Sequence, residues 1–162
     1  MKSESAITKN VMPGIKLFLD SSALFAGVVS SEGAARVLLL LAESGHIAAT
    51  ISEQVLAETE RAIARKVPRS LNDFRQAVFA SKVQIVRDPS PEEVNANLNL
   101  IFHAADVPIV LSAMGAKVDY LVTLNRVHFI DDPDVAIKSG LRIGTPGDAL
   151  HWVREQFSAE GK

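Results

Sequence analysis

The chain has 162 residues, enough for one folded domain with a single core and too few for two independent ones. It contains no cysteine, which excludes disulfides, thiolate metal sites and thiol nucleophiles, so any metal must be held by oxygen or imidazole. The net charge of -2 does not by itself indicate a nucleic-acid-binding protein.

Composition favours a packed globular fold. Hydrophobic residues make up 48% and charged residues 22% of the chain, as in ordinary globular domains. The N-terminal stretch has no apolar signal region, and the longest aliphatic run, at 37–42, is too short to span a bilayer, so we expect a cytoplasmic protein without a membrane segment. We expect a flexible N-terminal extension over 1–14, one domain over 15–157 and a short tail over 158–162.

Apolar runs alternate with helical patterns along the chain, which favours crossover units, a parallel sheet and the α/β class. The first strand is predicted over 15–20 and ends in an acid followed by two serines. A helix over 34–44 follows, and Gly45 can supply the left-handed conformation that ends it. Further strands are predicted at 46–51, 82–87, 119–124 and 141–145.

Capping signals mark several helices. Ser52 precedes a helix over 53–66, whose apolar side includes Val55 and Ile63. Ser90, followed by Pro91 and Glu93, forms a capping box that opens a helical segment reaching toward 102. The remaining helices are predicted over 71–80, from an Asp106 cap to Gly115, and over about 146–157, where Leu150, Trp152 or Val153 should pack on the sheet.

In open parallel sheets, ligands bind beyond the carboxyl ends of the strands. Several acidic and amide side chains of this chain are expected at that edge. Asp20 ends the first strand, Asp106 starts a helix, and Asn125 follows the fourth strand. Glu58 lies at the edge of the apolar side of its helix, where it can face the strand ends, whereas Glu60 points elsewhere.

Each acid has an ordinary structural interpretation when taken singly. Asp106 can serve only as a helix cap, and Glu58 only as a boundary residue beside Arg61 or Arg65. As a set they are harder to explain, because carboxylates about 4 Å apart repel by roughly 4 kcal/mol per pair at an effective dielectric of 20. A cation removes this repulsion, and oxygen ligands favour Mg²⁺ or Mn²⁺, which can activate water against a phosphate.

Three passages resemble the PIN domains, the family that includes the toxin ribonucleases of VapC-type toxin–antitoxin pairs. They are IKLFLDSSAL, SEQVLAETERAI and HAADVPIVLSAMGAKVDYLVTLNRVHF, and the closing LRIGTPGDAL is also similar to the family. The resemblance covers about residues 15–157. It implies a three-layer α/β/α sandwich around a four- to five-stranded parallel sheet, and a Mg²⁺- or Mn²⁺-dependent ribonuclease. It further implies a homodimer and a small antitoxin partner.

Carried over by position, the resemblance makes Asp20, Glu58 and Asp106 the acids of a metal centre. It makes Ser22 and Thr123 polar groups near the metal or phosphate. The chain departs from the family at Asn125, where many members have aspartate, so one negative charge is lost and a second metal site is weakened. Compensation by Asp131, Asp132 and Asp134 would require their loop to fold back, and we favour a solvated turn around Pro133.

His128 follows Asn125 by three residues and is a candidate for contact with a phosphate or leaving oxygen, although packing at the sheet edge explains it equally well. The other histidines, His46, His103 and His151, show no ligand spacing and are assigned no chemistry. Five basic residues lie within one stretch of the chain. They either guide substrate phosphates toward the acids, with Arg65 and Arg69 as the candidates for substrate binding, or form a solvated helix face. These are Arg61, Arg65, Lys66, Arg69 and Arg75.

The leading hypothesis is a metal-dependent endoribonuclease, the toxin of a toxin–antitoxin pair, with RNA favoured by the resemblance. The alternative is a PIN-like module that binds RNA or a protein with weak or no catalysis, because Asn125 replaces an acid. A nucleotide-binding α/β domain ranks last, since no glycine-rich phosphate loop follows the first strand.

Overall fold

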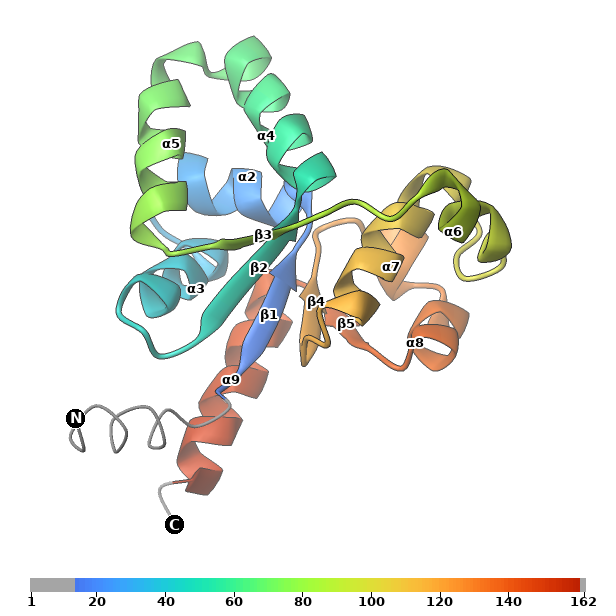
Figure 1. The fold of residues 1–162 in the computed structure, drawn as a ribbon. Coiled ribbons are helices and arrows are strands. Elements are labelled where there is room, and N and C mark those ends of the chain that lie inside the picture. The colour runs from blue at the N-terminus through green and yellow to red at the C-terminus, as the bar shows by residue number, and fades with distance from the viewer. Residues whose placement is uncertain (1–13, 161–162) are drawn as a thin grey trace, which may run out of the picture.

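The computed structural model describes residues 14–160, so the extension expected over 1–14 lies, except for Gly14, outside the described residues. Its centre is a five-stranded parallel sheet in the order β3-β2-β1-β4-β5 (Figure 1). The strands are β1 (Lys16–Leu19), β2 (Ala48–Ser52), β3 (Gln84–Val86), β4 (Tyr120–Val122) and β5 (Arg142–Gly144). Four of them lie within the predicted ranges, β2 extends one residue past its predicted end at 51, and the α/β architecture is confirmed.

The first half of the chain builds β1, β2 and β3 with their connecting helices. After β1 come α2 (Ser21–Val29) and α3 (Ala34–Glu43), and Gly45, with φ of 84°, follows the second of them as predicted. After β2 come α4 (Glu53–Lys66), the 3-10 turn η1 (Pro68–Ser70) and α5 (Leu71–Ala80). Figure 1 shows α4 and α5 as a pair that stands beyond the carboxyl ends of the strands.

The second half of the chain contains the less regular elements. They are α6 (Pro91–Ala96), the 3-10 turn η2 (Ala104–Asp106), α7 (Val107–Gly115), the π-helical turn η3 (Arg126–Ile130), α8 (Pro133–Ser139) and α9 (Pro146–Glu160). α9 continues three residues past the expected domain end at 157. As predicted, Leu150 and Val153 of α9 are buried, and the Trp152 ring lies 5.6 Å from that of Tyr120 on β4.

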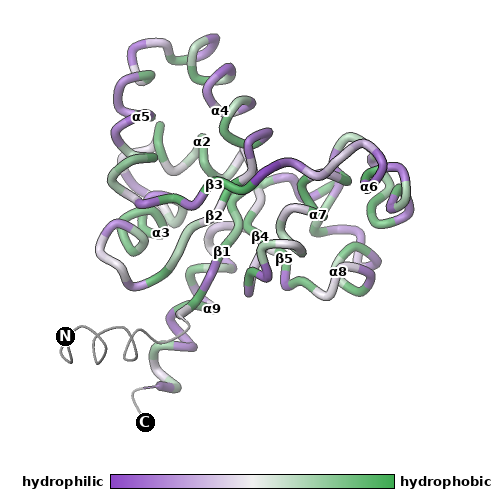
Figure 2. Tube along the Cα trace, viewed as in Figure 1, coloured by the Kyte–Doolittle hydropathy of each residue, from purple (hydrophilic) through white to green (hydrophobic). Residues whose placement is uncertain are grey.

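Helices cover both faces of the sheet. α3 and α9 pack against each other on one face, and α7 packs on β2 on the other (Figure 1). The central strand β1 is therefore buried on both sides, with Leu17 and Phe18 fully inaccessible to solvent. In Figure 2, α4 alternates hydrophobic and hydrophilic residues, as expected for a helix with one buried side. Its buried residues are Val55, Thr59 and Ile63.

Three local predictions were wrong. No helix was predicted directly after β1, yet Ser21–Val29 forms α2, whose Gly27 allows close approach of α3: a Cβ there would lie 2.7 Å from Leu39 Cδ1. The helix opened by the Ser90 capping box ends at Ala96 and does not reach 102. Pro133 begins α8 with Asp132 as its side-chain cap, so this segment is helical, whereas a solvated turn was expected.

None of the helices within residues 14–160 is by itself both long and apolar enough to cross a membrane. The pair α2 and α3 reaches that length and composition only jointly, across an 87° bend.

Candidate metal centre

Asp20 lies at the carboxyl end of β1 and begins α2. Its backbone N–H donates to Val122 O of β4 at 3.1 Å, which extends the sheet ladder by one residue. Its side-chain Oδ1 accepts from the backbone N–H of Ala23 at 2.9 Å and from Ser22 Oγ at 2.7 Å, and Oδ2 accepts a short hydrogen bond from Thr123 Oγ1. The residue is 6% exposed. Asp20 is thus a helix cap held in a single orientation.

Ser22 and Thr123 join the ends of β1 and β4 around this carboxylate. Ser22 Oγ accepts from Leu124 N–H at 2.9 Å, and Thr123 Oγ1 accepts from Asn125 N–H at 2.9 Å. Thr123 is itself fully buried. We call Asp20, Ser22 and Thr123 the buried half of the centre. Every side chain in it makes at least two hydrogen bonds, so its geometry is fixed before any ligand binds.

Burial raises the pKa of Asp20 above its ordinary value of 3.8, and the nearby charge of Asp106 raises it further. The hydrogen bonds from Ser22, Thr123 and Ala23 lower the same pKa without cancelling the effect of burial. The carboxylate is therefore held in place while its charge is poorly solvated. A cation beside it would supply the missing stabilisation.

Asp106 supplies the second acid, from the end of η2. It occupies the N-cap position of α7, but its side chain makes no capping hydrogen bond, so the prediction that it caps this helix was wrong. Its Oδ2 contacts His128 Nδ1 at 2.9 Å, and its side chain is 21% exposed. The carboxylate is turned toward the centre and away from the helix end.

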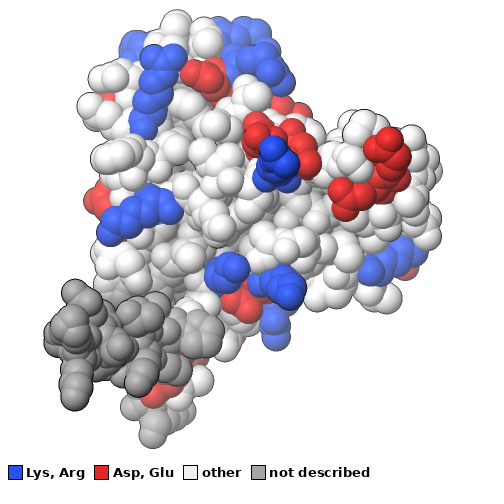
Figure 3. Space-filling view, viewed as in Figure 1, with Lys and Arg blue, Asp and Glu red and all other residues white. Residues whose placement is uncertain are grey.

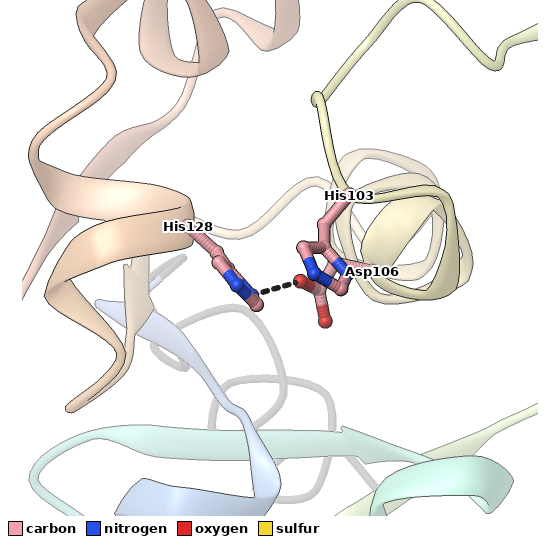
Figure 4. A group of neighbouring side chains, drawn as sticks. All are labelled: His103, Asp106 and His128. Atoms are coloured by element: carbon pink, nitrogen blue, oxygen red, sulfur yellow. Dashed lines mark hydrogen bonds and ion pairs between the residues drawn. The ribbon is translucent and has the colours of Figure 1, made fainter.

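His128 and Asn125 are held by the η3 turn. Asn125 Oδ1 accepts from the backbone N–H of His128 at 3.1 Å, and Asn125 Nδ2 lies 3.0 Å from His128 Nδ1. His103 stacks on the His128 ring, with centroids 3.8 Å apart and an interplanar angle of 24°. Figure 4 shows His103, Asp106 and His128 converging from two segments. We call these three residues, together with Asn125, the histidine half of the centre.

The two halves lie close enough to interact electrostatically, since the charge of Asp106 acts on Asp20. Glu58 makes no hydrogen bond to either half: it is half-buried on α4, and its Oε2 accepts from Gln54 Nε2 at 3.1 Å. Glu60 points to α5, where it pairs with Arg75 at 3.1 Å, in agreement with the prediction that it faces elsewhere.

One group of three possible metal-ligating side chains has its ligand atoms within 4.8 Å of one another among residues 14–160: His103, Asp106 and His128. The three acids Asp20, Glu58 and Asp106 do not form such a group in that part of the chain. Sequence reasoning missed His103, although its position three residues before Asp106 is a spacing that brings side chains together in helical turns.

The two basic residues predicted to bind substrate, Arg65 and Arg69, are exposed at the far end of α4 and in η1. Figure 3 shows Lys and Arg side chains gathered over this end of the molecule. Lys66, at the end of α4, has its Nζ 5.7 Å from the centre of the Phe25 ring. Arg65 is seven residues from Glu58, about 10 Å along the helix.

The profile of the PIN domain family matches residues 16–127, which is more than half of the chain. The protein therefore belongs to the PIN domain family, whose members are generally nucleases that use a divalent metal. No curated protein matches the chain significantly.

Solved structures share the fold at low sequence identity. PAE2754 from Pyrobaculum aerophilum is 15% identical, with a TM-score of 0.59 over 87% of this chain and 90% of that one. VapBC2 from Rickettsia felis, bound to a DNA fragment from their promoter, is 18% identical, with a TM-score of 0.57 over 81% of this chain and 98% of that one. FitAcB from Neisseria gonorrhoeae is 14% identical, with a TM-score of 0.52 over 80% and 97%.

The donor atoms are compatible with a divalent cation. A carboxylate has about four lone-pair positions, and the hydrogen bonds to Asp20 use three of them, which leaves one on Oδ2. Asp106 uses one on Oδ2 and makes no hydrogen bond through Oδ1 within the described residues. Oxygen ligands of this kind suit Mg²⁺ or Mn²⁺, and the residues present therefore fit the metal that the family uses.

Proposed function

We propose that this protein is a Mg²⁺- or Mn²⁺-dependent endoribonuclease whose metal centre is built on Asp20 and Asp106, with Glu58 as the third acid. The observation that carries the proposal is the orientation of Asp106: at the start of α7 it forgoes the cap position's usual hydrogen bond, and its charge acts on the buried carboxylate of Asp20. Without a cation between them, the two carboxylates repel each other, and this repulsion destabilises the metal-free fold. Such an arrangement is expected of a metal-binding site.

Each residue has a distinct part in this proposal. Asp20 offers its remaining lone pair in a fixed direction because Ser22 and Thr123 hold the carboxylate. Asn125 positions His128 through its side-chain oxygen. The bound cation would polarise the phosphate and lower the pKa of an attacking water. His128, half-exposed beside Asp106, is placed to donate a hydrogen bond to a phosphate or leaving oxygen.

The substrate and partner belong to the same proposal. Exposed Arg65 and Arg69 give the acidic protein a local cationic surface for an RNA backbone. In this proposal the protein is a cytoplasmic toxin that forms a homodimer and is inhibited by a small antitoxin; the fold that it shares with VapBC2 supports the antitoxin partner.

Cleavage of labelled single-stranded and structured RNA by the purified protein is the direct test, with single-stranded DNA of the same sequence as the comparison. We expect cleavage of RNA with Mg²⁺ or Mn²⁺ and none with chelator. Asp20→Asn and Asp106→Asn should each lower the rate at least ~100-fold, the scale of losing a group that acts on the reacting phosphate. Unchanged cleavage in both variants would refute the site assignment.

A binding module without catalysis is the second candidate, and Asn125 is the observation that favours it. Its amide is engaged with His128 and brings no charge to the place where many family members have an acid. RNA binding that is indifferent to chelator, combined with no cleavage under any metal, would favour the module. A calorimetric Mn²⁺ signal that disappears in Asp20→Ala would favour the enzyme.

A further inference from the structure

The histidine half of the centre carries donor atoms that a magnesium site does not need. His103, Asp106 and His128 place two imidazoles and one carboxylate with their ligand atoms within 4.8 Å of one another (Figure 4). Mg²⁺ prefers oxygen ligands and retains water, whereas imidazole suits Zn²⁺, Fe²⁺ or Ni²⁺, and the affinity of a site with nitrogen ligands rises along the first row from Mn²⁺ to Cu²⁺. The chemistry of this group therefore differs from that of Asp20 and Glu58.

The hydrogen bonds of the group are incompletely matched. His128 Nδ1 lies 2.9 Å from Asp106 Oδ2, which can only accept, and 3.0 Å from Asn125 Nδ2, which can only donate. The orientation of the Asn125 amide is fixed, because its Oδ1 accepts from the His128 backbone N–H. One ring nitrogen cannot be donor and acceptor at once, so one of the two contacts is unsatisfied in either tautomer. The fully bonded buried half shows no such conflict.

The two imidazole rings of the group are stacked face to face, with ring centroids 3.8 Å apart. The His103 ring makes no hydrogen bond within residues 14–160 and is exposed, so its nitrogens are free for a ligand from solvent.

We propose that His103, Asp106 and His128 form a mixed imidazole–carboxylate site that makes the centre bind a divalent first-row metal in preference to Mg²⁺, with Mn²⁺ as the probe because it also accepts oxygen ligands. His103 is the new element, since no catalytic or binding role attaches to it otherwise. The binding of the metal stands independently of catalysis. Its identification with the nuclease centre, through the shared Asp106, rests on the proposed function.

Calorimetric titration of the full-length protein with MnCl₂ and, separately, MgCl₂ tests the site. Removing one ligand in His103→Gln should weaken Mn²⁺ binding by at least about 10-fold, the smallest loss typical even for the residues that support a metal ligand, while the affinity for Mg²⁺ changes by less than about 3-fold. His151→Gln is the matched control, because His151 is an exposed histidine on α9 that pairs with Glu155 at 3.4 Å. It should change neither affinity.

Electron paramagnetic resonance of the Mn²⁺-loaded protein gives a readout that does not depend on activity. Nitrogen modulation from a directly bound imidazole should be present in the parent protein and in His151→Gln, and should be reduced in His103→Gln. Because His103 is exposed and lies outside the core, His103→Gln should retain the parent melting temperature, which excludes misfolding as the cause.

The outcomes separate this inference from the proposed function. Equal Mn²⁺ affinity in the parent and His103→Gln, or the absence of nitrogen modulation in the parent, would overturn the mixed site even if the protein cuts RNA. Histidine-dependent Mn²⁺ binding in a protein that cuts no RNA under any metal would uphold the site and overturn the nuclease.

Discussion

The two halves of the proposed metal centre are built in opposite ways. The buried half is held by the ends of β1 and β4: Asp20 is 6% exposed and accepts three hydrogen bonds. The histidine half is carried by the short turns η2 and η3, and its Asp106 and His128 side chains are 21% and 31% exposed. One carboxylate is rigid and poorly solvated, and the other is accessible and weakly constrained.

This difference assigns the two acids different physical roles. Asp20 is part of the fold as well as of the proposed site, because its side chain caps α2 and connects two strands. Asp106 forms no cap, so its proposed role is in the centre alone. A preorganised ligand reduces the entropy lost on metal binding, whereas an accessible one can exchange water and substrate. Substitutions that change stability and RNA cleavage separately test this difference between the two acids.

The largest contrast is expected between Asp20→Ala and Asp106→Ala. Both should lower RNA cleavage at least ~100-fold, but only Asp20→Ala should destabilise the fold, by about 1–3 kcal/mol, because it removes a helix cap and leaves buried donors unpaired. Asp106→Ala should stay within about 0.5 kcal/mol of the parent protein. Urea unfolding followed by circular dichroism, beside the cleavage assay, measures both quantities.

Glu92→Ala, in the exposed first turn of α6, controls for the general loss of a carboxylate and should change neither quantity. Equal destabilisation by Asp20→Ala and Asp106→Ala would remove the distinction between the two halves.

Thr123→Val tests whether the buried half acts through its hydrogen bonds. Valine keeps the shape of threonine but leaves Asn125 N–H without its acceptor and Asp20 without one donor. We expect a loss of about 1–3 kcal/mol in stability, together with a roughly 10-fold fall in cleavage as Asp20 loses its orientation. Thr123→Ser retains the hydroxyl and should recover most of the activity. A Thr123→Val variant as active as the parent would show that Asp20 needs no such support.

Local sequence signals were enough to predict the strands, two helix caps and the buried acid. Alternating apolar runs marked all five strands, and the Ser52 and Ser90 caps marked α4 and α6, because these signals are local. Asp20 was found for the same reason, since an acid directly after a buried strand must lie at the carboxyl edge of a parallel sheet. The metal role itself came from the family resemblance.

The histidine half was only partly predictable. The stacking of His103 on His128 joins residues 25 positions apart through two short turns, and no periodicity specifies how such turns pack. α2 was missed because the apolar run after Asp20 has almost no polar face, with buried residues such as Leu24 and Gly27 beside half-buried ones. The roles of Glu58, Arg65 and Arg69 are still predictions.

Smaller effects are expected from the charge of Asp20. Burial raises the pKa of this carboxyl above the 3.8 of an ordinary aspartate, so between the two values the native state binds more protons than the unfolded chain. The stability of the metal-free protein should therefore fall as the pH rises through this window and stay lower above it. Asp20→Asn lacks this contribution, so its stability should not fall in this window.

Thermal unfolding of both proteins with chelator, from pH 4 upward, measures this difference, since the other acids contribute equally to the two curves. Added Mn²⁺ should stabilise the parent more than it stabilises Asp20→Asn, which keeps the histidine half but lacks the Asp20 charge. Parallel curves over the whole range would mean that the buried carboxylate costs the fold nothing.

The smallest effect concerns the cations outside both halves. RNA binding is measured in the catalytically inactive Asp106→Asn background. If exposed Arg65 contacts an RNA phosphate, adding Arg65→Ala should weaken RNA binding by only a few-fold. It should also lower the slope of log affinity against log salt by about 0.7, the value for one contact on a single strand. Arg75→Ala is the matched control, because Arg75 is already paired with Glu60 and should leave the slope unchanged. An equal change of the salt slope in both variants would indicate a diffuse effect of net charge. A change of the slope confined to Arg65→Ala would mean that the RNA lies along α4, the helix that also carries Glu58.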